Sequence, residues 1–171
     1  VAELSIGPGD QSGVQIGPLI DAEAVAKVEA YIADALAHGA KIEIGGRRGQ
    51  QGPLFYEPTV LSGVTQAMRV AREEIFGPVA PLFSFDSEEE VIAMANATEY
   101  GLAAYFYTLD ARRAWRVTEA LEYGMVGHNT GLISNEVAPF GGIKQSGVGR
   151  EGSRHGMEEY QELKYWCSVV E

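Results

Sequence analysis

One segment with residues suited to ligand contact is EEIFGPV at 73–79, where two acids precede an aromatic residue and a Gly-Pro pair. Pro78 excludes a helix interior, and Gly77 permits unusual backbone angles. In an extended segment Glu74 and Phe76 point to the same side. They would pair a carboxylate suited to a ribose hydroxyl with a ring suited to a nicotinamide. The alternative is a solvated acidic loop with Phe76 packed in the core.

A second segment, PFGGIKQSGVGRE at 139–151, has four glycines in thirteen residues. A backbone with so few side chains can approach a ligand or another chain closely. The sequence has no GxGxxG between a strand and a helix and no GxxxxGK(S/T), so a phosphate cradle is weakly supported. The alternative is a structural loop packed under a neighbouring element.

Composition excludes several function classes. Lys and Arg total 13 against 24 for Asp and Glu, a formal net charge of -11, which disfavours binding to nucleic acid or to an anionic membrane. The single cysteine, Cys167, cannot form an internal disulfide, so a reducing, cytoplasmic location is expected. His38, His128 and His155 lack the spacing of metal ligands, so no metal site is expected.

The pattern of apolar residues predicts strands that alternate with helices, which is typical of an α/β fold with a parallel sheet. Asp21 is the expected cap of a helix that buries Val25, Val28, Ile32 and Leu36 and ends before Gly39. Further helices are expected after a capping box at Ser87 and Glu90, from Asp110 to about Tyr123, and near 151–160. Strands are expected at 41–44, 54–61, 80–85, 102–108, 125–128 and 163–170.

These segments resemble a known family. EEIFGPV at 73–79, PFGGIKQSGVGRE at 139–151 and IGPLID at 16–21 resemble hallmark segments of the aldehyde dehydrogenase superfamily, in the same order. GLISNEVA at 131–138 and REGSRHGMEEYQELKY at 150–165 are similar to succinate-semialdehyde dehydrogenases. The resemblance extends over essentially the whole chain.

The resemblance implies that residues 1–171 are a single fragment of a longer protein. About 1–160 would be part of the catalytic domain, with a largely parallel sheet flanked by helices. About 161–171 would be an oligomerisation segment containing the final strand, since an apolar strand at a chain end needs a partner. The cofactor domain and the nucleophile are expected upstream, in the missing N-terminal part, and the full protein is expected to be a homo-oligomer.

The implied activity is oxidation of succinate semialdehyde to succinate with NAD or NADP. In the family a cysteine thiolate forms a thiohemiacetal and then a thioester, which water activated by a glutamate base releases. Both residues are expected upstream, so this fragment would hold no catalytic residue and be inactive alone; Cys167 is not the family's nucleophile. The alternatives are another aldehyde dehydrogenase, for glutarate semialdehyde or a neutral aldehyde, and a non-catalytic association module.

The resemblance also assigns binding roles. Glu74 would accept hydrogen bonds from the nicotinamide ribose, and Phe76 would pack near the nicotinamide ring. Phe140 would line the aldehyde tunnel, and the Ser134 hydroxyl would join two upstream arginines in holding the carboxylate of a small carboxylated aldehyde. Glu151 would lie near the site.

Two of these roles have structural alternatives. The Ser134 hydroxyl could instead bond to its own backbone. Glu151 could instead form a salt bridge with Arg150 or Lys144.

Overall fold

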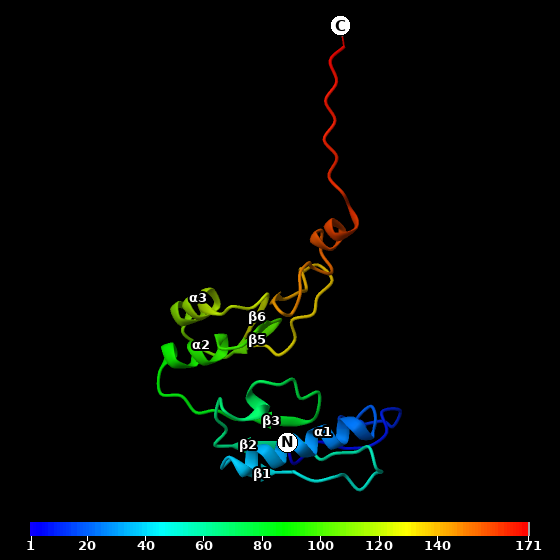
Figure 1. Cartoon of the computed structure of the whole chain (residues 1–171), viewed down its shortest axis with the longest axis vertical. Coiled ribbons are helices and arrows are strands. Elements are labelled where there is room, and N and C mark those ends of the chain that lie inside the picture. The colour runs from blue at the N-terminus through cyan, green and yellow to red at the C-terminus, as the bar shows by residue number, and fades with distance from the viewer. Residues whose placement is uncertain (171) are drawn as a thin grey trace. The chain divides into compact units, whose positions relative to one another are not determined.

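A computed structural model describes residues 1–170, which divide into two compact units (Figure 1). The first unit is Val1–Phe85, and the second begins at Asp86. No helix among the described residues is both long and apolar enough to cross a membrane. The predicted domain bounds, about 1–160 and about 161–171, stay a prediction.

Three α-helices, two 3₁₀ helices and seven strands make up the described chain. The helices are α1 (Ala22–Ala37), η1 (Arg69–Ala71), α2 (Glu88–Asn96), α3 (Ala111–Ala120) and η2 (His155–Tyr160). The strands are β1 (Lys41–Ile44), β2 (Thr59–Ser62), β3 (Val79–Pro81), β4 (Tyr100–Gly101), β5 (Ala103–Phe106), β6 (Met125–His128) and β7 (Ile143–Lys144).

Helix α1 has the ends that the sequence predicts. Asp21 accepts a hydrogen bond from the N–H of Ala24 at 2.8 Å, which satisfies one of the free donors of the first turn. Gly39 follows the last turn with a φ of 95°, and the N–H of Ala40 donates back to the carbonyl of Ala35 at 3.0 Å. This left-handed ending satisfies carbonyls that would otherwise be free.

The core of the first unit forms between α1 and the residues that follow it. Leu61 and Met68 are fully buried against the helix face that carries Val25, Val28 and Ile32. The prediction that Leu36 belongs to this face is wrong: it is 43% exposed. Ala35, which precedes Leu36, and Tyr31, which lies one turn before Ala35, are buried instead, so the buried face is centred nearer Val28 and leaves Leu36 at its margin.

A three-stranded sheet in the order β1-β2-β3 supports this core. Strands β1 and β2 are antiparallel, while β2 and β3 are parallel, with Thr59 opposite Val79. The turn after β1 requires glycine at position 45, because a Cβ there would lie 2.3 Å from the carbonyl oxygen of Pro58.

The second unit contains a βαβ unit. Strand β5 leads through α3 to β6, and the two strands pair in parallel from Ala103 opposite Met125 onward. Ser87 caps α2 as predicted, accepting from the N–H of Glu90 at 3.1 Å. Strand β4 pairs with β7 in the antiparallel direction.

Helix α3 ends at Ala120, three residues before the predicted end at Tyr123. The cause lies in α2: the Asn96 side chain donates to the carbonyl of Ala120 at 2.8 Å and accepts from the N–H of Glu122 at 2.9 Å. A side-chain amide thus replaces the next helical turn. A contact so distant in sequence could not be seen in the local pattern of α3.

Two fold predictions need correction. The strand pairing is not largely parallel, because two of the four strand pairs among the described residues are antiparallel. Residues 163–170 form no strand, since the segment after η2 has neither helix nor strand (Figure 1). The side chains of this segment are exposed. A strand needs a hydrogen-bonded neighbour, and within residues 1–170 this segment has none.

Candidate functional site

The loop after η1 presents Phe76 to solvent. This residue has a φ of 46°, and its side chain is 76% exposed. Such a left-handed backbone is uncommon for a bulky residue and persists only where the surroundings hold it. The alternative interpretation, in which Phe76 packs in the core, is therefore wrong. Gly77 brings the loop against α1, since a Cβ there would lie 2.4 Å from a methyl of Val28.

A charged network fixes the start of this loop. Arg69 donates to both carboxylate oxygens of Glu73, at 2.7 Å and 2.9 Å, and the Tyr31 hydroxyl donates to the same group at 3.0 Å. The bonds from Arg69, with that from Tyr31, lower the pKa of Glu73 to about 2. Burial raises the pKa of Tyr31, and its bond to Glu73 raises it further. Glu73 is thus an anchor and not a free ligand.

Glu74 differs from its neighbour. Its side chain is exposed and forms no hydrogen bond within residues 1–170, while its backbone carbonyl accepts from Nζ of Lys27 at 3.3 Å. Free carboxylate oxygens and an exposed ring two residues apart suit a ribose diol next to a flat heteroaromatic ring. The loop therefore presents hydrogen-bond acceptors and an aromatic ring on one exposed side, which is the combination that the predicted roles of Glu74 and Phe76 need.

In the second unit, Ser134 and Phe140 line one cavity of about 430 Å³. Strand β6 supplies Met125 and Val126 to its wall, and the loop that follows adds further apolar residues, namely Leu132, Ile133, Ala138 and Pro139. The cavity joins a hydroxyl to apolar and aromatic surface. Such a site can hold a short chain and hydrogen-bond a polar group at its end.

The hydrogen bonds that shape the loop around Ser134 do not involve its hydroxyl. The loop is turned by Thr130, whose side chain accepts from the N–H of Leu132 at 3.1 Å, and by Asn135, which accepts from the N–H of Val137 at 3.0 Å. Within the described chain Ser134 makes no hydrogen bond of its own. The alternative in which its hydroxyl bonds the local backbone is therefore not seen.

Glu151 holds Phe140 through the backbone. The two residues form an isolated antiparallel bridge, which closes the Gly-rich loop between them. Arg150 donates to the carbonyls of Gly142 and Gly149, at 2.8 Å and 2.7 Å. The alternative salt bridge of Glu151 with Arg150 or Lys144 does not occur within the described chain.

The loop at 139–151 also borders a second hollow. This cavity of about 660 Å³ is lined by the Gly-rich backbone together with Phe140, Glu151 and residues of η2. Lys144 lies apart from it, pairing with Glu122 at 2.6 Å. Phe140 is therefore shared by two cavities, whereas Ser134 lines the smaller one only.

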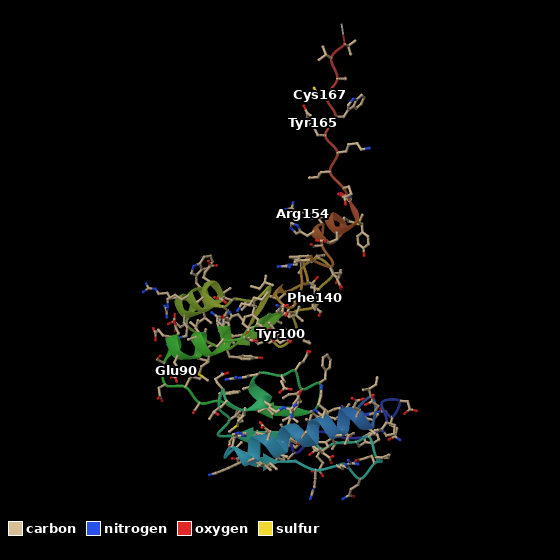
Figure 2. The ribbon with its side chains drawn as sticks, in the orientation of Figure 1. Glu90, Tyr100, Phe140, Arg154, Tyr165 and Cys167 are labelled. Carbon is tan, nitrogen blue, oxygen red and sulfur yellow. The ribbon has the colours of Figure 1, made fainter. Side chains whose placement is uncertain are left out.

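Cys167 is exposed in the segment that follows η2. Figure 2 shows Cys167 and Tyr165 well apart from Phe140. The cavity that Ser134 and Phe140 line does not include this thiol. That Cys167 is not the nucleophile stays a prediction.

The predicted site residues fall into two groups. Glu74 and Phe76 lie on one loop of the first unit. In the second unit Phe140 shares one cavity with Ser134 and the other with Glu151.

Two residues of α1 that contact the loop of Glu74 and Phe76 were not predicted from the sequence. Lys27 and Tyr31 are four residues apart on α1 and so share a face, and Lys27 lies 5.9 Å from the ring centroids of both Tyr31 and Phe76. The spacing of the two residues is evident in the sequence, but their contact with the loop of Glu74 and Phe76 could not be predicted from it.

Two curated relatives are similar over almost the whole chain. The glutarate-semialdehyde dehydrogenase of Pseudomonas aeruginosa is 61% identical over 98% of this chain and 35% of its own length. The 3-sulfolactaldehyde dehydrogenase of Pseudomonas putida is 60% identical over 96% of this chain and 34% of its own. The chain thus spans about a third of the length of these relatives.

Solved structures and the family comparison agree. The crystal structure of a succinate-semialdehyde dehydrogenase from Burkholderia pseudomallei matches with a TM-score of 0.96 and 62% identity, covering 99% of this chain and 35% of that one. Residues 1–166 match the aldehyde dehydrogenase family. Since the match takes in nearly the entire sequence, the chain belongs to the aldehyde dehydrogenase family.

Proposed function

We propose that this chain is the C-terminal part of an NAD(P)+-dependent dehydrogenase that oxidises succinate semialdehyde to succinate. The observation that carries the proposal is that Ser134 and Phe140 line the same cavity. The ring provides apolar surface for the short chain of the aldehyde. The hydroxyl, which has no partner among residues 1–170, is available to the distant carboxylate.

The similar proteins support an anionic aldehyde. Their names denote substrates that carry, besides the aldehyde, a carboxylate or a sulfonate. A hydroxyl that donates to such a group forms a charge-assisted bond, worth about 1.5–3 kcal/mol. Ser134 alone cannot neutralise the anion, so positive residues from the rest of the longer protein are required.

The cofactor side of the proposal rests on Glu74 and Phe76. Glu74 would accept hydrogen bonds from ribose hydroxyls, and the Phe76 ring would pack near the nicotinamide. The dinucleotide, when bound, supplies the acceptor of the electrons removed from the aldehyde. These two residues do not distinguish NAD from NADP, because neither a carboxylate nor a phenyl ring binds a 2′-phosphate.

The reaction itself belongs to the longer protein. In this proposal a cysteine and a glutamate base outside these 171 residues carry the covalent chemistry, and the isolated chain oxidises no aldehyde. Residues 1–170 contribute the walls for substrate and cofactor. Glu151 acts by fixing Phe140 through their backbone bridge.

The test compares the full-length protein with its S134A variant on succinate semialdehyde and on butanal. We expect the KM for succinate semialdehyde to rise about tenfold to a hundredfold in S134A, with the KM for butanal unchanged. Thr118→Ala, on the exposed face of α3, is the matched loss of a hydroxyl and should change neither value.

Other outcomes separate the alternatives. A full-length protein that prefers glutarate semialdehyde or butanal belongs to another substrate class in the same family. Equal KM changes for both aldehydes in S134A would show that Ser134 does not bind the carboxylate of the substrate. A full-length protein without any aldehyde oxidation would favour the non-catalytic association module.

A further inference from the structure

The cavity that Ser134 and Phe140 line has a polar edge made of two neighbouring residues. Asn135 lines it as well, and among the described residues Ser134 and Asn135 are the ones that bring polar side chains to its wall. The rest of the lining is glycine and apolar side chains, without an acidic residue, although the chain has a formal net charge of -11. The polar edge can therefore receive an anionic group without repulsion from a carboxylate in the same wall.

A hydrogen bond fixes the orientation of the Asn135 side chain. Its amide oxygen accepts from the N–H of Val137 at 3.0 Å. Only the oxygen of an amide accepts from an N–H, so this bond also determines which end of the side chain is the NH2 group. Because the amide is planar, a bound oxygen restricts where the NH2 group lies.

The turn that carries Asn135 is itself anchored. The N–H of Ala138 donates to the carbonyl of Asn135 at 3.1 Å, and the N–H of Ser153 donates to the carbonyl of Glu136 at 2.9 Å. A Cβ at Gly152 would lie 3.0 Å from the carbonyl oxygen of Ala138, so the two segments are in close contact. The backbone beside Asn135 is therefore supported from outside its own loop, by the residues that precede η2.

The donors of this polar edge are not used by the described chain. The NH2 group of Asn135 has no acceptor within residues 1–170, and the hydroxyl of Ser134 forms no hydrogen bond there either. A hydroxyl offers one donor and an amide offers two, while a carboxylate accepts through both of its oxygens. Two adjacent side chains of this kind can therefore each bind one oxygen of the same carboxylate.

We propose that Asn135 is a specificity-determining residue whose amide donates, beside the Ser134 hydroxyl, to the anionic group at the far end of the aldehyde substrate. The inference rests on the proposed function for the identity of the substrate. The Ser134 hydroxyl binds one oxygen of the carboxylate, and the Asn135 amide binds the other. The pair thereby selects aldehydes with a terminal anion over neutral aldehydes of the same length.

The experiment uses the full-length protein and the variants N135D and N135A. Aspartate keeps an oxygen that accepts from the N–H of Val137, so the turn is retained, but it replaces the NH2 donor with a negative oxygen. Alanine loses both the acceptor and the donor. Gln50→Glu, at an exposed position of the first unit, is the matched change of an amide to a carboxylate. The measurements are KM and kcat on succinate semialdehyde and on butanal, the Kd for succinate by calorimetry, and the thermal midpoint.

We expect N135A to raise the KM for succinate semialdehyde about tenfold, the factor for losing one charge-assisted hydrogen bond. N135D should raise it about a hundredfold, because a like charge then faces the substrate carboxylate. The Kd for succinate should rise in the same order, and Gln50→Glu should change neither value. In N135D the KM for butanal, the kcat for both aldehydes and the thermal midpoint should stay those of the unmodified protein, since the turn keeps its acceptor and the far end of the substrate does not react.

The inference is overturned if N135D leaves the KM for succinate semialdehyde and the Kd for succinate unchanged, since Asn135 would then only shape the turn. It is also overturned if N135D raises the KM for both aldehydes equally or fails to fold, because the NH2 group would then serve the protein itself. The Kd for succinate needs no turnover and so tests Asn135 without the reaction. An unmodified protein that does not prefer succinate semialdehyde to butanal would instead overturn the proposed function.

Discussion

Phe140 and Glu151 are joined by a pair of backbone hydrogen bonds. The N–H of Phe140 donates to the carbonyl of Glu151 at 2.9 Å, and the N–H of Glu151 donates back at 2.7 Å. Ten residues separate the partners, four of them glycine. The bridge therefore closes a loop whose own composition would leave it mobile, and it fixes an aromatic side chain on a cavity wall.

Adding a side chain at Gly124 should disturb the loop that this bridge closes. A Cβ at that position would lie 2.0 Å from the carbonyl oxygen of Gly141, a backbone atom that cannot rotate away. We expect Gly124→Ala to destabilise the full-length protein by about 1–3 kcal/mol in urea unfolding. Gly131→Ala is the control, because its nearest neighbour beyond the adjacent residues would be the Tyr107 hydroxyl at 3.9 Å. Equal losses in both variants would contradict the prediction.

The Arg69–Glu73 pair should add a stability that depends on pH. The pKa of Glu73 is lowered from 4.5 to about 2, chiefly by Arg69. The contribution is therefore complete above pH 4.5 and is lost as the pH falls from about 4.5 to about 2. We expect Glu73→Gln to lower the thermal midpoint at pH 6 and to converge with the unmodified protein as the pH drops below 4.5. A difference between the two proteins that is constant over this pH range would show that the ion pair is not its source.

The free carboxylate of Glu74 should matter for nucleotide binding and not for folding. We expect Glu74→Gln to raise the Kd for the preferred nucleotide about threefold to tenfold, since a charged acceptor becomes a neutral one. The thermal midpoint should not move, because Glu74 forms no side-chain hydrogen bond within residues 1–170. Glu3→Gln, also exposed, is the control. An equal Kd for both variants would remove Glu74 from the nucleotide site.

The segment after η2 should take part in assembly of the full-length protein. Its apolar side chains are exposed in the described chain, among them Leu163, Tyr165, Trp166 and Val169. A partner strand would bury them and pair the free backbone. We expect Val169→Asp to reduce the oligomer order in sedimentation velocity, with Ser168→Asp as the control for added charge. An unchanged oligomer in Val169→Asp would count against the predicted oligomerisation segment.

Where a structure depends on neighbours in the sequence, the sequence was enough to predict it. Asp21 and Gly39 mark the ends of α1 because caps act within one helical turn. The βαβ unit around α3 follows from two short apolar strands separated by a capped helix. The family could be recognised for the same reason, because each of its hallmark segments is an uninterrupted stretch of the sequence.

Only the tertiary structure decided the features that depend on distant contacts. Helix α3 stops early because Asn96 reaches its last carbonyl from another helix. Phe76 is exposed and left-handed, although an apolar residue next to Gly-Pro also suggested burial in the core. Ser134 and Phe140 share a cavity because the chain folds β6 and two loops around one space. Such contacts depend on packing between segments, which no local pattern of residue types contains.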